Sequence, residues 1–364
     1  NYTRKTIFVD LVSLFYKKFL RPLFFSLEAE VVHELVCRNL AYLEKSVLAK
    51  KLIGNALGSN SSPINLFGLS FPNQLGLAAG LDKDGRFPGI SSALGFGHIE
   101  VGTITPNSQP GNAKPRLFRY PKDGALINRM GFNNDGAKKL IERLETSYPK
   151  GKRISPVGVN IGKGKETPIR DASKDYIKAL DVVAEQADYI TINISSPNTP
   201  ELRKLQNKGY LDSLLGEISN RRDHWCKVNQ GKSLPLLLKL SPDESFASIE
   251  RIIGTANDLG FDGVIATNTS TGRDNLKMPK NYESGGLSGK PIEKRSIDVI
   301  RFISILTNSR FPIIGVGGIY DTDSALRKLD AGASLLQIYT SFIYEGPLFP
   351  STLVKSLSYR KSFF

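Results

Sequence analysis

Residues 189–200 read YITINISSPNTP, an apolar run that ends in a cluster of small polar side chains. Tyr189 and the isoleucines that follow it are aromatic or β-branched and suit a buried strand. The polar residues behind them are too dense to be core filler, because each polar group buried without a partner costs roughly 1–3 kcal/mol. The segment is therefore typical of a strand whose end carries chemistry.

The same design recurs along the chain, with a small or polar residue closing each short apolar run. The runs are Leu75–Ala79, His98–Thr103, Val157–Ile161, Tyr189–Ile194, Pro235–Leu240, Gly263–Ala266, Pro312–Val316 and Ser334–Ile338. Most of the intervals hold a helix-like stretch, such as Asp171–Gln186, Ser245–Leu259, Ile292–Leu306 and Thr322–Ala331. This alternation predicts an α/β protein, a (β/α)8 TIM barrel, whose active site lies at the C-terminal strand ends.

Composition agrees with one large enzyme domain. A chain of 364 residues with 40% apolar content can bury a substantial core, and α/β barrels commonly exceed 250 residues. Cys37 and Cys226 are far apart and lack CxxC spacing, so neither a disulfide framework nor a zinc site is indicated. Three scattered histidines, His33, His98 and His224, give no basis for a metal site, and we expect none.

The net charge is less specific than its size suggests. A balance of +14 favours anionic ligands and surfaces in general. The basic residues are spread along the chain, without an RNA-recognition signature or a zinc finger, so we expect no nucleic-acid partner. An acidic small substrate or a phospholipid surface fits better.

The first fifty residues differ from the barrel pattern. Apolar residues recur there at helical spacing from Phe8 to Phe24, and five basic residues stand against one acid, Asp10, before residue 22. A membrane-spanning helix needs about 20 apolar residues nearly free of charge, and a signal peptide needs an uninterrupted apolar stretch with a cleavage site. Two interpretations stay open: an amphipathic segment lying on a membrane, or a helix packed on the barrel.

The strand ends closely resemble the dihydroorotate dehydrogenase family, and specifically its membrane-associated, quinone-dependent class. The resemblance runs in order from about residue 65 to 347. Its motifs are NQLGLAAGLDKDG (73–85), EVGTITPNSQPGNAKPRLFRYP (100–121), LINRMGFNNDG (126–136), GVNIG (158–162), TINISSPNTP (191–200), LLLKLSPD (236–243), IATNTS (265–270), GGLSGKPI (285–292), IIGVGGI (313–319) and LQIYTSFIYEGP (336–347).

The resemblance implies an FMN enzyme that oxidises dihydroorotate to orotate, passes electrons to a quinone and serves pyrimidine (UMP) biosynthesis. Ser196 matches the catalytic base of the family. A serine is a poor base alone, so its placement among polar partners must help to activate it. The related soluble class carries cysteine at this position, and the serine here favours the quinone class.

The resemblance also implies a set of substrate contacts. An ammonium at Lys83 suits the orotate carboxylate and negative charge developing on the flavin, although a solvated loop lysine is the ordinary alternative. The asparagines offer amide groups to the pyrimidine, or else they cap the strand and turn. The expected substrate residues are Lys83, Asn128, Arg129, Met130, Gly131, Phe132, Asn193, Asn198, Asn268 and Thr269.

The FMN contacts follow from the same resemblance. Lys239 ends an apolar strand, where an unpaired charge is costly, so the flavin ring or a structural salt bridge is its expected partner. Gly317 and Gly318 leave amides free to approach a phosphate, or simply meet the needs of a tight turn. Thr340 replaces a frequent serine and keeps the hydroxyl. The expected cofactor residues are Ala79, Gly80, Leu81, Asp82, Lys83, Thr103, Asn160, Asn193, Lys239, Thr267, Gly289, Gly318, Tyr339 and Thr340.

The N-terminal region matches the quinone entrance of this class, with His33 and Arg119 at the head-group site. We therefore expect residues 1–50 to form a membrane and quinone-access segment and residues 51–364 to form the catalytic barrel. No Arg- and Ser-rich transit pattern stands out, so we expect a peripheral protein on the cytoplasmic side of a bacterial inner membrane. A mitochondrial inner membrane is the alternative. We expect a monomer, because a membrane-facing helix pair already uses one exposed apolar surface.

Two other functions stay open at this point. Another FMN or phosphate-binding barrel enzyme would share the last two strand ends without needing both NRMGF and ISSPNT. A membrane-bound barrel that has lost catalysis would lack polar residues at the strand ends, and none of the expected catalytic positions is missing.

Overall fold

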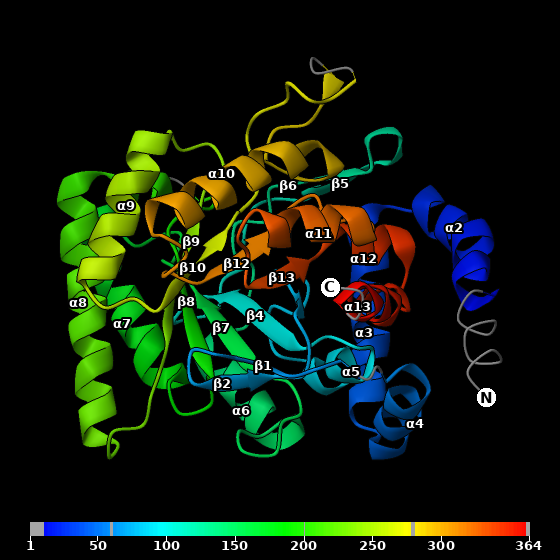
Figure 1. The fold of residues 1–364 in the computed structure, drawn as a ribbon, viewed down its shortest axis with the longest axis horizontal. Helices are drawn as coiled ribbons and strands as arrows, with labels where there is room; N and C mark the ends of the chain where they lie inside the picture. Colours follow the sequence, from blue (N-terminus) through cyan, green and yellow to red (C-terminus); the bar gives the residue numbers. More distant parts are fainter. Residues whose placement is uncertain (1–10, 59–60, 200, 278–280, 362–364) are drawn as a thin grey trace.

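The protein is built around a closed barrel of parallel strands, seen in a computed structural model that describes residues 11–58, 61–199, 201–277 and 281–361. The strands are hydrogen-bonded in the order β10-β12-β13-β3-β4-β7-β8-β9 (Figure 1). Their bounds are β3 Leu75–Leu77, β4 His98–Ile104, β7 Val157–Ile161, β8 Tyr189–Asn193, β9 Leu236–Leu240, β10 Gly263–Ala266, β12 Ile313–Val316 and β13 Leu335–Ile338. Each predicted apolar run overlaps one of these strands, and only β4 extends beyond its run, by one residue, so the predicted TIM barrel is confirmed.

The strands read as continuous apolar runs because both of their faces are buried. In β8, Ile190 and Ile192 pack outward into the core shared with the helices. Tyr189 points inward and packs with Leu237 and Ile265 inside the barrel. Parallel sheets covered on both faces commonly show this pattern.

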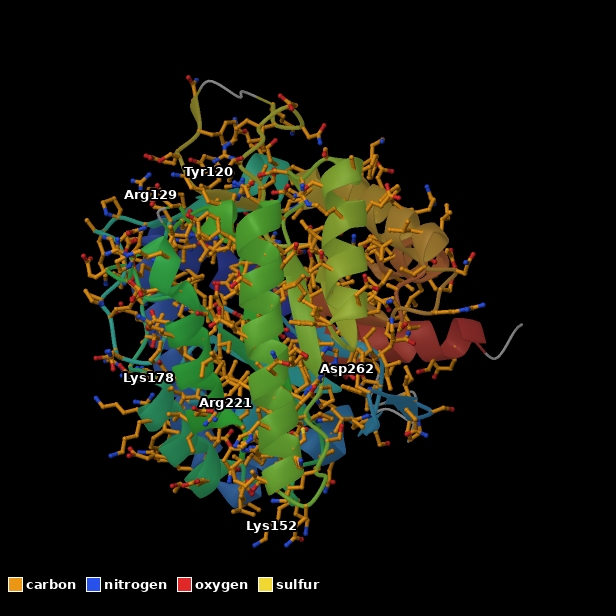
Figure 2. All side chains as sticks on the ribbon, turned by 90° about the vertical axis from the view of Figure 1, so that its left-hand side faces the viewer. Tyr120, Arg129, Lys152, Lys178, Arg221 and Asp262 are labelled. Carbon is orange, nitrogen blue, oxygen red and sulfur yellow. The ribbon has the colours of Figure 1, made fainter. Side chains whose placement is uncertain are left out.

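Helices surround the barrel and include all four predicted stretches. Ser245 begins α9 by accepting a hydrogen bond from the amide of Ser248, and Asp321 caps α11 in the same way. Arg221 of α8 pairs with Asp181 of α7 on the face shown in Figure 2. The helices are α5 Pro88–Ala93, α6 Ala137–Ser147, α7 Ala172–Val183, α8 Lys208–Val228, α9 Phe246–Asp258, α10 Glu293–Leu306, α11 Thr322–Asp330, α12 Thr340–Glu345 and α13 Phe349–Lys361.

Two small sheets lie at the ends of the barrel. The hairpin of β1 (Ile64–Leu66) and β2 (Leu69–Phe71) covers the N-terminal strand ends, where Phe71 packs edge-on against His98. At the opposite end, β5 (Leu117–Tyr120), β6 (Ala125–Asn128) and β11 (Gly286–Gly289) form an antiparallel sheet. This second sheet forms a roof over the strand ends that were predicted to carry chemistry.

The N-terminal extension is helical and lies along one side of the barrel, next to α5, α12 and α13 (Figure 1). It comprises the π-helix η1 (Tyr16–Leu20), α2 (Arg21–Ser26), α3 (Ala29–Glu44) and α4 (Val47–Leu57). The proposed boundary at residue 50 falls within α4. The carboxylate of Glu44 accepts hydrogen bonds from the amides of Gly89 and Ile90 at the start of α5, so α3 is joined directly to the barrel layer.

One face of the first helices packs on α12 and the other is open. The hydroxyl of Tyr16 donates to the carbonyl of Ile343 at 2.6 Å, whereas Phe15 and Phe19 are 52% and 63% exposed. Among the described residues, no helix is long and apolar enough to cross a membrane. The first ten residues of the predicted amphipathic stretch, Phe8 among them, lie outside the described residues.

Candidate active site

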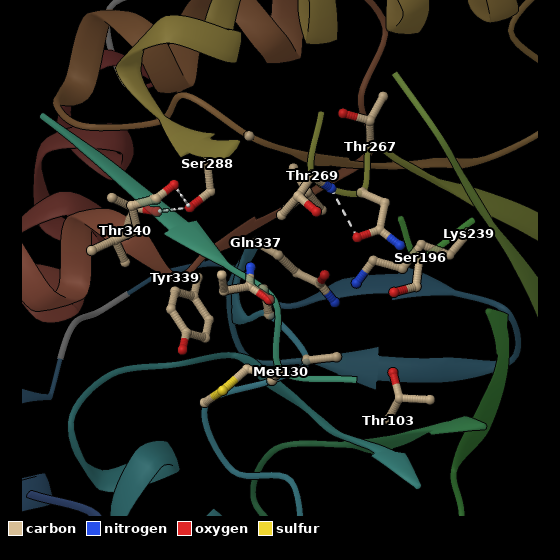
Figure 3. Close-up of a pocket in the computed structure, with 18 of the residues that line it drawn as sticks. Thr103, Met130, Ser196, Lys239, Thr267, Thr269, Ser288, Gln337, Tyr339 and Thr340 are labelled. Carbon is tan, nitrogen blue, oxygen red and sulfur yellow. Dashed lines mark hydrogen bonds between the residues drawn. The ribbon is translucent and has the colours of Figure 1, made fainter. Parts of the chain in front are cut away.

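A cavity lies at the C-terminal ends of the barrel strands, beneath the antiparallel sheet (Figure 3). The empty space that it encloses, counted together with its open mouth, is about 1080 Å³. Most of the predicted site residues meet here. Those that line it are Ala79, Gly80, Lys83, Thr103, Asn128, Met130, Gly131, Phe132, Asn193, Ser196, Asn198, Lys239, Thr267, Asn268, Thr269, Gly289, Gly318, Tyr339 and Thr340.

Ser196 follows β8 in a turn that places its hydroxyl at the cavity. Its Oγ accepts a hydrogen bond from the backbone N–H of Asn198 at 3.3 Å. The Asn198 side chain donates to Oδ1 of Asn128 at 3.1 Å, and Nδ2 of Asn268 donates to Oδ1 of Asn193 at 3.1 Å. The asparagine side chains thus hold one another in place around Ser196. They stabilise the turn after β8 and also present amide groups to the cavity.

Lys83, in the loop after β3, presents an ammonium to the cavity from one side. Its Nζ donates to Oδ1 of Asn133 at 2.9 Å. Burial, helped by the positive charge of Arg116, lowers the pKa of Lys83 from 10.5 to about 8. The lysine therefore carries a positive charge at neutral pH, and an anionic ligand would strengthen that state.

The cavity floor is a polar network that crosses the barrel interior. Lys239 and Gln337 point toward each other there (Figure 3). Both donate to the buried carboxylate of Glu100 in β4, Lys239 at 3.3 Å to Oε1 and Gln337 at 2.8 Å to Oε2. Asn160 donates to the same carboxylate at 2.7 Å. Lys239 thus forms a structural ion pair with Glu100, which is one of the two interactions expected for it. It also lines the cavity.

The far end of the cavity is lined by backbone. Gly317 and Gly318 have positive φ angles of 101° and 75°, and a Cβ on Gly318 would lie 2.4 Å from the Cα of Glu293. Turn geometry and close packing therefore require glycine here. The amides of Gly317 and Gly318 donate no hydrogen bond to the described part of the chain. Across the cavity, the hydroxyls of Thr340 and Ser288 lie 2.8 Å apart.

Four predicted residues lie close by without lining the cavity. Arg129 turns outward at the end of the barrel seen in Figure 2, where it pairs with Glu283 at 2.7 Å and stacks 4.6 Å above the ring of Phe118. The Arg129 side chain therefore lies away from the cavity, while the other residues of the predicted substrate loop, Asn128–Phe132, line it.

The other three act behind the cavity wall. Asp82 accepts hydrogen bonds from the amides of Arg86 and Phe87, which shapes the loop after β3. The carbonyl of Leu81 faces the thiol of Cys37. Asn160 lies one layer below the cavity, where it accepts a hydrogen bond from the hydroxyl of Thr103.

His33 and Arg119 lie at the junction between the N-terminal helices and the barrel. Burial and the charge of Lys83 lower the pKa of His33 to about 3, so its imidazole is neutral. Arg119 donates to the carbonyls of Phe24 and Leu27, which ties down the turn between α2 and α3. Neither residue lines the cavity.

The sequence matches known proteins over nearly its whole length. The model of the family described as dihydroorotate dehydrogenase matches residues 62–360. A protein of Delftia acidovorans named dihydroorotate dehydrogenase (quinone) is 45% identical over 335 residues, covering 91% of this chain and 95% of the relative. The chain belongs to the dihydroorotate dehydrogenase family. A similarly named protein of Chloroflexus aurantiacus is 45% identical and covers 95% of this chain and 96% of its own length.

Solved structures of the family agree. Dihydroorotate dehydrogenase of Eimeria tenella in complex with ferulenol superposes with a TM-score of 0.77 at 35% identity and covers 89% of both chains. The ligand-free form of the same enzyme gives a TM-score of 0.74 at 35% identity, covering 85% of this chain and 93% of that one.

Sequence reasoning missed several residues that shape this dehydrogenase site. Gln337 and Ser288 line the cavity, and Glu100 holds its floor together. Glu100 had a readable signal, because it is the one acid in the apolar run His98–Thr103. Gln337 stood out less, and nothing in the local sequence of Ser288 distinguishes it from a loop serine.

Proposed function

We propose that this protein oxidises (S)-dihydroorotate to orotate, with FMN as the hydride acceptor and a membrane quinone as the final electron acceptor, in pyrimidine biosynthesis. The observation that carries the proposal is the position of Ser196, at a cavity whose asparagines and Lys83 suit an anionic pyrimidine. Family membership supports the same activity, because the relatives from Delftia acidovorans and Chloroflexus aurantiacus bear the quinone-dependent name.

The unpaired polar groups of the cavity fit FMN. The hydroxyl of Thr267 is buried without a hydrogen-bond partner in the described part of the chain, and the Lys239 ammonium borders the same floor. These groups suit the polar edge of the flavin ring, while the free amides of Gly317 and Gly318 suit its phosphate. The remaining cofactor contacts would come from the backbone of Ala79 and Gly80 and from Thr103, Asn193, Gly289, Tyr339 and Thr340.

The substrate would lie between the flavin and the asparagines. Asn128, Asn193, Asn198 and Asn268 present amide donors and acceptors that match the ring edge of a pyrimidine. Lys83 would bind the carboxylate, because its half-buried ammonium lines the cavity and is held by Asn133. Roofing of the cavity by β5, β6 and β11 limits the access of water, which strengthens these electrostatic contacts.

Ser196 would remove the proton during the oxidation. A bound FMN would supply the acceptor for the hydride that leaves the substrate carbon next to the one that loses the proton. To act as a base, the Ser196 oxygen must pass its own hydroxyl proton on to solvent as it takes the proton of the substrate. The hydrogen bond from the Asn198 amide would hold this oxygen and stabilise the negative charge on it until the substrate proton arrives. One proton and one hydride leave, and the ring gains a carbon–carbon double bond.

The N-terminal helices would provide access for the quinone. Phe15, Phe19 and Leu23 form an exposed apolar face, each more than half exposed, which suits the surface of a bilayer. His33 and Arg119 lie where these helices join the barrel and would contact the quinone head group. We place this monomeric enzyme on the cytoplasmic side of a bacterial inner membrane, with a mitochondrial inner membrane as the alternative.

The test is anaerobic addition of dihydroorotate to the purified protein, followed by visible absorbance. The flavin spectrum should bleach in the wild type. Ser196→Ala should keep the flavin and bind orotate but bleach about 10²–10⁴-fold more slowly, the usual contribution of a positioned acid–base group. A flavin that does not respond to dihydroorotate would favour a different FMN barrel enzyme. Near-normal bleaching of the variant would remove Ser196 as the base.

A further inference from the structure

Glu100 is a fully buried acid at the centre of the barrel. Its carboxylate receives hydrogen bonds from Asn160 of β7, Lys239 of β9 and Gln337 of β13. The donors reach it from three other strands, and they lie 60, 139 and 237 residues away in the chain. All three partners are donors, which is the arrangement that suits a carboxylate.

Only part of this network faces the cavity. Lys239 and Gln337 line it, whereas Glu100 and Asn160 do not. Glu100 therefore lies directly behind the ammonium of Lys239, with both side chains less than a tenth exposed. In such an enclosed site, charges act on one another far more strongly than in water. A ligand on the floor would feel the lysine and the acid behind it together.

We propose that Glu100 is a positioning residue that holds Lys239 at the cavity floor and, by its own negative charge, limits how strongly that lysine favours the reduced flavin. This inference rests on the proposed function, because it requires a flavin bound above Lys239. Reduction adds two electrons and one proton to the ring, which thereby gains a negative charge. Charge near the flavin ring is one of the means by which a protein tunes its reduction potential.

The two partners should therefore have opposite effects. Glu100→Gln removes a negative charge and leaves the lysine uncompensated, so the flavin should be easier to reduce. Lys239→Met leaves the acid uncompensated, so the flavin should be harder to reduce. A role in packing alone would not produce shifts of opposite sign.

The structure can accommodate Glu100→Gln with little rearrangement. Oε1 of Gln337 has no hydrogen-bond partner among the described residues, so a flip of that amide lets it accept from the new side-chain amide. Asn160 can still donate to the remaining oxygen. Thr191→Val is a matched control, because Thr191 is fully buried on β8 and its hydroxyl is also unpartnered. This control changes the barrel interior without changing its charge.

The experiment measures the midpoint potential of the flavin-loaded protein by equilibration with a reference dye, after flavin content has been verified. Glu100→Gln should shift the two-electron equilibrium at least about tenfold toward reduced flavin, which corresponds to about 30 mV. Thr191→Val should stay at the wild-type value. An unchanged potential in Glu100→Gln, or a shift of the same sign in Lys239→Met, would overturn the inference.

The proposed function and this inference fail in different ways. Wild-type protein whose flavin does not bleach with dihydroorotate contradicts the function, whatever the potentials are. If Glu100→Gln loses its flavin, the potential cannot be measured, and flavin binding by the double variant Glu100→Gln/Lys239→Met, which lacks both charges, becomes the test. Recovery of flavin binding in the double variant supports the inference that Glu100 balances the charge of Lys239. A double variant that still fails to bind flavin overturns this inference.

Discussion

Replacing Glu30 by glutamine tests whether the N-terminal helices help to hold the predicted substrate loop, Asn128–Phe132. Glu30 of α3 and Arg116 form a buried pair whose side chains are 2% and 7% exposed. The guanidinium donates to both carboxylate oxygens, at 2.8 Å through Nη2 and at 3.0 and 3.2 Å through Nε. Removing one member of such a pair typically costs about 3–5 kcal/mol.

The free-energy cost of Glu30→Gln should fall near the lower limit of this range, because Arg116 keeps two other hydrogen-bond acceptors. Its Nη1 donates to the carbonyls of Pro110 and Asn112 at 2.7 and 2.8 Å. A loss of about 3 kcal/mol corresponds to about a 150-fold larger equilibrium constant for opening. Amide hydrogen exchange reports such local opening, so the amides of α3 should exchange about 100-fold faster in Glu30→Gln.

The matched control is Glu34→Gln on the same helix. Among the residues that the structure describes, Glu34 forms an ion pair only with Lys114, and both side chains are more than half exposed, so the loss should be at most about 1 kcal/mol. Exchange in α8, on the other side of the barrel, should stay the same in both variants. If α3 exchanges equally fast in Glu30→Gln and Glu34→Gln, the buried pair does not anchor the helix.

The same variant should weaken substrate binding. Asn112, whose carbonyl Arg116 holds, donates through Nδ2 to the carbonyls of Arg129 and Asn198 at 3.0 and 3.1 Å. Loosening Arg116 therefore loosens the loop on either side of the cavity. We expect the KM for dihydroorotate to rise in Glu30→Gln with a smaller change in kcat, measured by steady-state turnover.

Two further predictions concern Lys83 and the N-terminal helices. The affinity for orotate should be highest below about pH 8 and fall by up to tenfold per pH unit above it, because the pKa of Lys83 is about 8 in the free enzyme and only its ammonium attracts the carboxylate. Spectral titration with orotate should show this fall in the wild type and no pH dependence in Lys83→Gln. A wild-type affinity that stays constant from pH 7 to 9.5 would refute the assignment. Removal of residues 1–27 keeps Glu30 and Glu44, so dihydroorotate should still reduce the flavin at the wild-type rate in stopped flow. Turnover with long-tailed quinones should fall, whereas turnover with a short soluble quinone should stay at the wild-type level. Unchanged long-tailed turnover together with retained vesicle binding would show that these helices serve packing alone.

The barrel could be predicted because its strands are buried on both faces. Such strands leave short apolar runs in the sequence, and the polar residues that follow them, such as Asn193 and Ser196, meet at one end of any parallel barrel. The helices between them carry ordinary signals as well, as at Ser245 before α9. These features are local, so the sequence displays them directly.

The remaining features depend on pairings between distant residues. The antiparallel roof joins β5 and β6 to β11, which lies more than 150 residues later, and no turn signal links them. Arg129 lies in the predicted substrate loop, but Glu283 draws its side chain outward. The partners of Glu100 lie on three other strands. An apolar run with one acid indicates that a partner exists, but only the closed barrel identifies it.

The buried acid Glu30 affects the charge of Lys83 as well as the position of the loop. Burial and the charge of Arg116 lower the pKa of Lys83, whereas the charge of Glu30 raises it. Burial raises the pKa of Glu30 itself, but the hydrogen bonds and charge of Arg116 outweigh burial and hold it below its ordinary value of 4.5, so Glu30 is charged at every pH at which Lys83 titrates. Glu30→Gln therefore leaves Arg116 uncompensated beside Lys83 and should lower the pKa of Lys83 further. The pH at which orotate affinity begins to fall should then move to a lower value in Glu30→Gln than in the wild type or in Glu34→Gln. If the three profiles coincide while α3 exchanges faster in Glu30→Gln, then α3 affects the substrate site through the position of the loop and not through its charge.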